Sequence, residues 1–120
     1  MQTLLRLSLP PYPCPRPRAG VKGVFNDPKY SAWKREAIKQ LSLEWQNTPL
    51  DSVTKLSAQF YGWNRRGDLS NLFKAIEDAI VQAGVLRDDN LTVIQHIETA
   101  WEKADSKESQ HIDVLLEYER

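Results

Sequence analysis

The chain opens with an alternation of apolar and polar positions that predicts a β-strand. Leu5, Leu7 and Leu9 share one face of such a strand, and a period of two is the pattern of a half-buried strand. The same alternation returns twice further along the chain. We therefore expect strands over three stretches, residues 3–9, 53–63 and 111–118.

Two other stretches repeat their apolar residues at steps of three and four, which predicts amphipathic helices. Asp27 followed by Pro28 is a good helix start, because the carboxylate caps the first turn and proline is tolerated at its first position. A second stripe runs from Leu69 to Ala83, and Gly84 can end that helix. We expect helices near residues 28–46 and 70–83.

Residues 92–103 fit two patterns. Val93, Ile97 and Trp101 suit one face of a helix, whereas the β-branched residues suit a strand that pairs with 111–118 across a polar turn at 104–110; periodicity does not distinguish the two. A length of 120 residues fits one domain, residues 1–120. The expected fold class is α/β or α+β, with a small mixed sheet of about four strands (near 3–9, 53–63, 92–103 and 111–118) covered by two helices.

A proline-rich segment follows the first strand. Five prolines lie among the eight residues from Pro10 to Pro17, and this density excludes a helix or a central strand. We expect an extended basic arm over residues 10–24 that holds Arg16 and Arg18 at a fixed spacing.

Charge is balanced overall but unevenly distributed, with 16 basic and 16 acidic residues. Residues 1–40 carry eight basic against two acidic residues, a net charge of +6, and residues 77–120 carry four against eleven, a net charge of −7. A positive surface of this kind can hold phosphates although the total is neutral. The uneven distribution is explained equally well by charged surfaces that face solvent and bind no partner.

Cysteine content and hydropathy indicate a cellular compartment. Cys14 is the only cysteine, so neither an intramolecular disulfide nor a cysteine-based zinc site can form, and a reducing cytoplasm is the simplest location. The N-terminal apolar run is too short for a signal peptide, and no stretch approaches the length of a membrane span. We expect a soluble cytoplasmic protein that has no contact with a membrane.

The second predicted helix carries a polar stripe with possible chemistry. Asp68 opens it, and Asn71, Lys74 and Asp78 follow at spacings of three and four. Such a set could hold a hard cation through oxygen ligands and place a positive charge beside a phosphate. On its own, the stripe is more simply explained as a capping aspartate on a solvated helix face. The later pair Asp88-Asp89 is, by itself, typical of a turn.

Together these segments resemble the RusA family of Holliday-junction resolvases, whose signature is an arginine-flanked Asp-Leu-Asp-Asn, a lysine on the next turn and a later Asp-Asp pair. Here Arg66 precedes Asp68-Leu69-Ser70-Asn71, Lys74 lies six residues after Asp68, and Asp89 lies twenty-one after it. The front of the chain agrees as well, with an apolar strand, Arg16-Pro17-Arg18 and a helix carrying Trp33-Lys34. The resemblance covers essentially the whole chain.

The resemblance implies a homodimer that binds four-way junctions and cuts two strands symmetrically with Mg²⁺, Mn²⁺ being possible. It implies that Asp68 and Asp89 are metal ligands and that Lys74 stabilises charge at the scissile phosphate. The catalytic residues would then be Asp68, Lys74 and Asp89. The residues expected to contact DNA are Arg16, Arg18, Arg65, Arg66, Asn71 and Lys74.

One position departs from the family pattern, because Ser70 stands where the family has its second aspartate. Serine supplies no charge to a cation, so Asp88 or Asp78 would have to compensate. The expected metal set is therefore Asp68, Asp89, Asp88 and Ser70. The alternative function is a junction-binding protein with weak or no catalysis, and a third reading is a protein-interaction domain with no DNA role.

Geometry limits how Asp89 can reach Asp68. A straight helix from Leu72 to Ala83 rises about 18 Å, and the six residues from Gly84 to Asp89 span at most about 20 Å. The two carboxylates can meet within one subunit only if the chain runs almost straight back. A shorter or tilted helix, or an Asp89 from a partner subunit, would relax this demand.

The aromatic and histidine residues give weaker signals. Trp33 and Trp45 lie on an apolar helical stripe and are expected in the core, whereas Trp63, beside Asn64-Arg65-Arg66, is the better candidate for stacking on unpaired bases. His96 and His111 are expected at or near the surface rather than as metal ligands.

Overall fold

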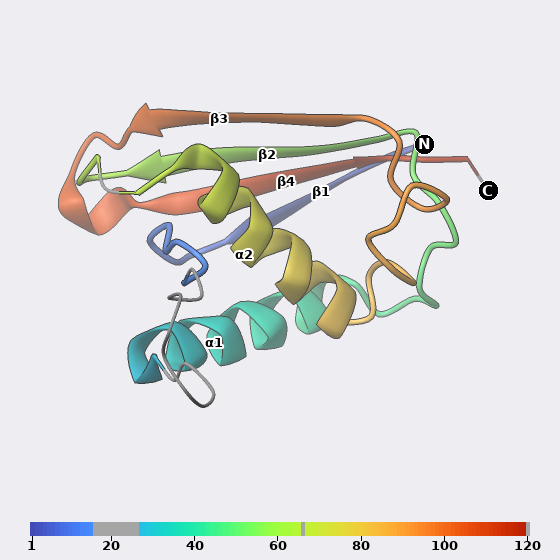
Figure 1. Cartoon of the computed structure of the whole chain (residues 1–120), viewed down its shortest axis with the longest axis horizontal. Helices are drawn as coiled ribbons and strands as arrows, with labels where there is room; N and C mark the ends of the chain where they lie inside the picture. The colour runs from blue at the N-terminus through green and yellow to red at the C-terminus, as the bar shows by residue number, and fades with distance from the viewer. Residues whose placement is uncertain (16–26, 66, 120) are drawn as a thin grey trace, which may run out of the picture.

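A computed structural model describes residues 1–15, 27–65 and 67–119 as a two-layer α+β fold. Four strands form one mixed sheet, and both helices lie on the same face of it (Figure 1). The fold class predicted from the sequence is confirmed. In chain order the elements are β1 (Gln2–Leu7), α1 (Pro28–Glu44), β2 (Lys55–Gly62), α2 (Leu69–Gln82), β3 (Ile97–Lys103), the short 3₁₀ helix η1 (Lys107–Ser109) and β4 (His111–Glu117).

The strands are ordered β1-β4-β2-β3, and β3 pairs with β2 in parallel while the other pairs are antiparallel. Residues 97–103 are therefore a strand, and the helical alternative for this region is wrong. The expected pairing with 111–118 is also wrong, because β2 lies between β3 and β4. The side chains of Leu56, Ala58 and Phe60 are buried in β2, which suits a central strand. The exposed charges of Glu98 and Glu102 in β3 suit an edge.

The helices begin where the sequence predicts. The Asp27 carboxylate accepts hydrogen bonds from the backbone N–H groups of Lys29 at 3.0 Å and Tyr30 at 3.2 Å, which caps α1. Helix α2 ends at Gln82, and Gly84, two residues later, has a positive φ of 79°, the left-handed conformation common just after a helix. Trp33 and Trp45 are buried in the core, as expected.

The first part of the proline-rich arm is held against both helices. The Trp33 indole donates to the Pro10 carbonyl at 2.7 Å, and the Cys14 N–H donates to the Asn71 carbonyl at 3.0 Å. Strand β1 ends at Leu7, before the prolines, rather than at residue 9. The arm thus lies beside the first turn of α2, while Arg16 and Arg18 fall outside the described residues. Within the described ranges, no helix is long and apolar enough to cross a membrane.

Candidate functional site

The loop after α2 is fixed against the rest of the fold by its backbone. The Leu50 N–H donates to the Val85 carbonyl at 2.9 Å, and the Arg87 N–H donates to the Leu50 carbonyl at 3.0 Å. Val85 and Leu86 are buried before the acidic pair, and Val93 is buried after it. These contacts hold the acidic residues of the loop beside the polar face of α2.

Lys74 joins this loop to the helix. Its Nζ lies 3.2 Å from Asp78 Oδ1, 3.3 Å from Asp89 Oδ2 and 3.6 Å from Glu77 Oε1. The two contacts within α2 follow from spacings of three and four, which place side chains on one face. The carboxylates of Glu77, Asp78 and Asp89 each offer an oxygen atom within 4.8 Å of the others. We call these three residues and Lys74 the acidic cluster.

The charges of the acidic cluster influence one another. Burial raises the pKa of Glu77, and the nearby Asp89 and Asp78 act in the same direction against the opposing effect of Lys74. Burial would also raise the pKa of Asp89, but the hydrogen bond from Lys74 and those around Asp88 hold it below its ordinary value. The hydrogen bond to Asp78 raises the pKa of Lys74, despite some burial. One ammonium therefore compensates three carboxyl groups only in part, and the cluster keeps a negative charge.

The donor set of the acidic cluster suits a hard divalent cation. Mg²⁺ and Mn²⁺ prefer oxygen ligands, and Mg²⁺ is commonly bound through one or two carboxylates together with water and substrate phosphates. Three carboxylates that converge, are partly exposed and are incompletely neutralised fit this requirement. Among the residues that the structure describes, Glu77, Asp78 and Asp89 form the group that could hold such an ion.

The structure brings together two of the three expected catalytic residues, Lys74 and Asp89. Asp68 is the N-cap residue of α2 and is not part of the three-carboxylate group. The Asp88 carboxylate accepts hydrogen bonds from the Asp89 N–H at 2.7 Å and from the Asn90 amide at 3.1 Å, so it organises the loop. Ser70 is exposed in the first turn of α2, two turns before Asp78.

Glu77 was not singled out by sequence reasoning, although a signal was present. It follows Lys74 by three residues, a spacing that places a carboxylate and an ammonium side by side on a helix. Its neighbour Asp78 was considered as a compensating carboxylate, and the structure places it in the cluster. The side chain of Glu77 is only 13% exposed, so it faces the loop rather than bulk solvent.

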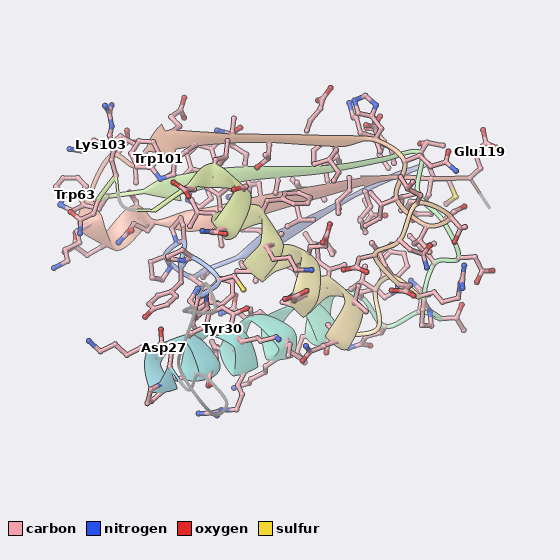
Figure 2. The ribbon with its side chains drawn as sticks, in the orientation of Figure 1. Asp27, Tyr30, Trp63, Trp101, Lys103 and Glu119 are labelled. Carbon is pink, nitrogen blue, oxygen red and sulfur yellow. The ribbon has the colours of Figure 1, made fainter. Side chains whose placement is uncertain are left out.

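Two of the residues expected near DNA, Trp63 and Arg65, lie at one end of the sheet. Figure 2 shows Trp63, Trp101 and Lys103 together where β2 and β3 end. The Arg65 guanidinium lies 5.4 Å from the centre of the Trp101 ring, and Lys103 Nζ lies 4.6 Å from that of Trp63. Arg66 falls outside the described residues. Asn71 lies in the first turn of α2, where its carbonyl accepts the hydrogen bond from the arm.

The two histidines are placed away from the acidic cluster. The ring of His111 stacks on Tyr61 with centroids 4.2 Å apart, and its Nε2 lies 3.8 Å from Asp113. His96 Nε2 lies 3.6 Å from Glu98. Within the described part of the chain, neither histidine belongs to a group of three potential metal ligands.

Comparison with known proteins places this chain in a family. The family model described as endodeoxyribonuclease RusA matches residues 8–115, a range that contains α1, α2, the acidic cluster and most of the sheet. The chain is also 30% identical over 82 residues to the crossover junction endodeoxyribonuclease RusA of Aquifex aeolicus (strain VF5). That similarity covers 68% of this chain and spans 64% of the length of the relative. The chain belongs to the RusA endodeoxyribonuclease family.

Proposed function

We propose that this protein is a metal-dependent endonuclease that resolves four-way DNA junctions by hydrolysing phosphodiester bonds, in recombination or repair. The observation that carries the proposal is the convergence of Glu77, Asp78 and Asp89 around Lys74 in a chain of the RusA family. Carboxylates that hold a hard cation beside an ammonium suit the hydrolysis of a negatively charged phosphodiester.

Each residue of the acidic cluster has a role in this proposal. A bound Mg²⁺ or Mn²⁺ would supply the positive charge that shields the phosphodiester and activates a water molecule. Glu77, Asp78 and Asp89 would hold the ion. Asp68, a ligand by resemblance to the family, lies at the start of α2, about 9 Å of helical rise before Lys74, so its role is proposed separately. Lys74 is 48% exposed, so its ammonium is accessible to donate to a phosphate oxygen as charge develops there.

Glu77 and Asp78 offer a physical answer to the missing carboxylate at position 70. Ser70 cannot supply charge, but the two acidic residues on the third turn of α2 already lie within 4.8 Å of Asp89. We therefore expect cleavage to be retained. Asp88 contributes indirectly, because its hydrogen bond to the backbone of Asp89 orients that residue.

Backbone contacts to DNA would come from the basic residues at the start of α2 and in the arm. Arg65, Arg66, Arg16 and Arg18 would contact phosphates, which positions the junction without reading its sequence. Symmetric cutting of two strands requires two sites held in one frame, so we expect a homodimer, measurable by analytical ultracentrifugation. The cytoplasm remains the expected location.

The decisive experiment is cleavage of an end-labelled four-way junction in Mg²⁺ and then in Mn²⁺. We expect paired symmetric nicks from the wild type, and a loss of at least about tenfold in rate for Glu77→Gln and Asp89→Asn, since each removes one charged ligand. Asp68→Asn tests the family-derived ligand in the same way. Asp105→Asn, a charge change on an exposed residue after β3, is the matched control and should cut like the wild type.

Other outcomes separate the rival functions. Wild-type protein that binds the junction but makes no nicks in either metal would favour a junction-binding protein, and nicks that then appear in Ser70→Asp would trace the loss to that position. Absence of any salt-dependent DNA binding would favour a protein-interaction domain.

A further inference from the structure

A pocket of about 380 Å³ opens at the end of the sheet, between the proline-rich arm and the start of α2. Its walls include Pro11, Pro13, Leu72, Trp101 and the backbone of Gly62, and Asn64 lies at its edge. A smaller hollow, which Trp101 also lines, is formed with Arg65, Gly67 and Leu69. A volume of this size falls within the range of roughly 300–1,000 Å³ typical of small-ligand sites.

Trp101 is the central wall of this pocket and is held there by its neighbours. It is partly exposed, unlike Trp33 and Trp45, which are buried. A Cβ atom on Gly62 would lie 2.6 Å from the Trp101 Nε1 atom, so the indole can pack against β2 only because position 62 has no side chain. The result is a flat aromatic surface, fixed in place, that faces a cavity rather than the core.

The surroundings of the pocket combine apolar walls with positive charge. The Arg65 guanidinium lies 5.4 Å from the Trp101 ring, and Lys103 lies on the neighbouring Trp63 ring. The side-chain amide of Asn64 is exposed at the edge, and an amide can both donate and accept hydrogen bonds with the edge of a base. A purely aliphatic ligand could form neither ionic contacts with the two cations nor hydrogen bonds with the amide.

We propose that this pocket receives one unpaired nucleobase of the branched DNA, stacked on Trp101, with Arg65 and Lys103 on the adjoining phosphates. The inference rests on the proposed function, since the branched substrate supplies the base. Stacking on an aromatic ring tolerates any base, because every base has a π-face. A branch point supplies such a base more readily than an uninterrupted duplex, where the base must first be unstacked and unpaired.

The position of the pocket relates the bound base to the cut. The pocket residue Leu72 and the cluster residues Lys74 and Asp78 lie on the same helix, α2. Lys74 follows Leu72 by only two residues, so the two side chains point to opposite sides of α2, Leu72 into the core and Lys74 toward solvent. The branch point would therefore lie near the cut, with the first turns of α2 between the captured base and the acidic cluster.

The test is a binding comparison that removes only the base. Junctions with one branch-point nucleotide replaced by an abasic analogue are titrated by fluorescence anisotropy in EDTA, so that no strand is cut. For wild-type protein we expect the abasic junction in which the captured base is missing to bind about tenfold more weakly, the scale of base–aromatic stacking. Trp101→Leu keeps an apolar side chain but removes the aromatic face. It should bind the intact junction about tenfold more weakly and lose nothing further on the abasic one.

Two further variants separate stacking from a folding defect. Trp63→Leu is the matched control, and its effect should add to that of the abasic site, because Trp63 lies outside the pocket walls. Gly62→Ala displaces the Trp101 ring without removing it and should also abolish the abasic penalty. Thermal unfolding of each variant identifies any that has lost its fold.

The possible failures have different meanings. Wild-type protein that binds intact and abasic junctions equally at every branch-point position overturns the nucleobase pocket and leaves the proposed function standing. An abasic penalty that persists in Trp101→Leu but vanishes in Trp63→Leu overturns the assignment to Trp101. Wild-type protein that binds no branched DNA overturns the proposed function and, with it, the occupant of the pocket.

Discussion

Replacing Lys74 with methionine isolates the electrostatics of the acidic cluster. The substitution keeps a similar unbranched apolar stem, one atom shorter, but removes the ammonium that contacts Glu77, Asp78 and Asp89. Three carboxylates with oxygens within 4.8 Å of one another would then repel without compensation. We expect the metal-free variant to be less stable than the wild type and to gain more stability from Mg²⁺.

The magnitude follows from distance and exposure. At 3.3 Å and an effective dielectric constant of about 20, one ion pair corresponds to about 5 kcal/mol before screening. Lys74 is 48% exposed, so the value for exposed pairs, about 0.2–1 kcal/mol each, is the better guide. Three contacts give about 0.6–3 kcal/mol, or a loss of roughly 2–12 °C in Tm.

Thermal unfolding by circular dichroism in EDTA and in excess Mg²⁺ measures both effects. Saturation at about 100 times Kd would stabilise the folded state by about 2.7 kcal/mol, and the variant should approach this limit at lower Mg²⁺ because no ammonium opposes the ion. Lys39→Met, an exposed lysine of α1, is the control. A Lys74→Met protein that equals the wild type in EDTA, and gains no more from Mg²⁺ than the control, would refute the reasoning.

Further predictions test other parts of the molecule. Burial raises the pKa of Glu77 above its ordinary value of about 4.5, so at pH values just above 4.5 the folded protein binds more protons than the unfolded chain. The free energy of unfolding should therefore fall as the pH rises through this range. Urea unfolding of Glu77→Gln, measured across pH in EDTA, should lack this fall. Gly62→Ala should lower the free energy of unfolding by about 1–3 kcal/mol, because the new Cβ overpacks against Trp101. In urea unfolding, the double variant with Trp101→Leu should lose less than the sum of the two single losses. Asp27→Ala removes both capping hydrogen bonds of α1 and should cost about 0.5–2 kcal/mol in urea unfolding; no measurable change would mean that water replaces the cap. Arg65→Ala should make the negative slope of log K against log[salt] for junction binding less steep by about one. An unchanged slope would mean that Arg65 does not contact a phosphate.

The elements that the sequence predicted best were those with local signals. The cap at Asp27, the stripe through Trp33, Ala37 and Leu41 and the glycine after α2 depend on neighbouring residues, and all three are found in the structure. Strand pairing depends instead on residues far apart in sequence. No pattern within 92–103 reveals that β2 will lie between this segment and β4, so the parallel pairing could not be read from it.

The candidate site shows the same division. Lys74 and Asp78 follow from helical spacing, and the resemblance to the family supplied Asp89 and Asp68. Glu77 was missed because an acidic residue beside a lysine on a helix is usually a solvated pair, and only the returning loop buries it. The Trp101 pocket was missed for a similar reason, because it forms from the arm, the end of β2 and the edge strand β3 together.

The length of α2 decides where along the helix the carboxylates meet. The helix spans 14 residues, a rise of about 21 Å, and the loop that follows must first satisfy its buried contacts at Val85 and Leu86. Because these contacts fix the first residues of the loop, fewer residues remain to carry the chain back along the helix before position 89. Asp89 therefore returns to Lys74 in the middle of the helix, about 9 Å of helical rise short of Asp68. Glu77 and Asp78, on the third turn, are therefore placed to share an ion with Asp89. For this reason we expect the absence of an aspartate at position 70 to reduce metal binding less than the family motif implies.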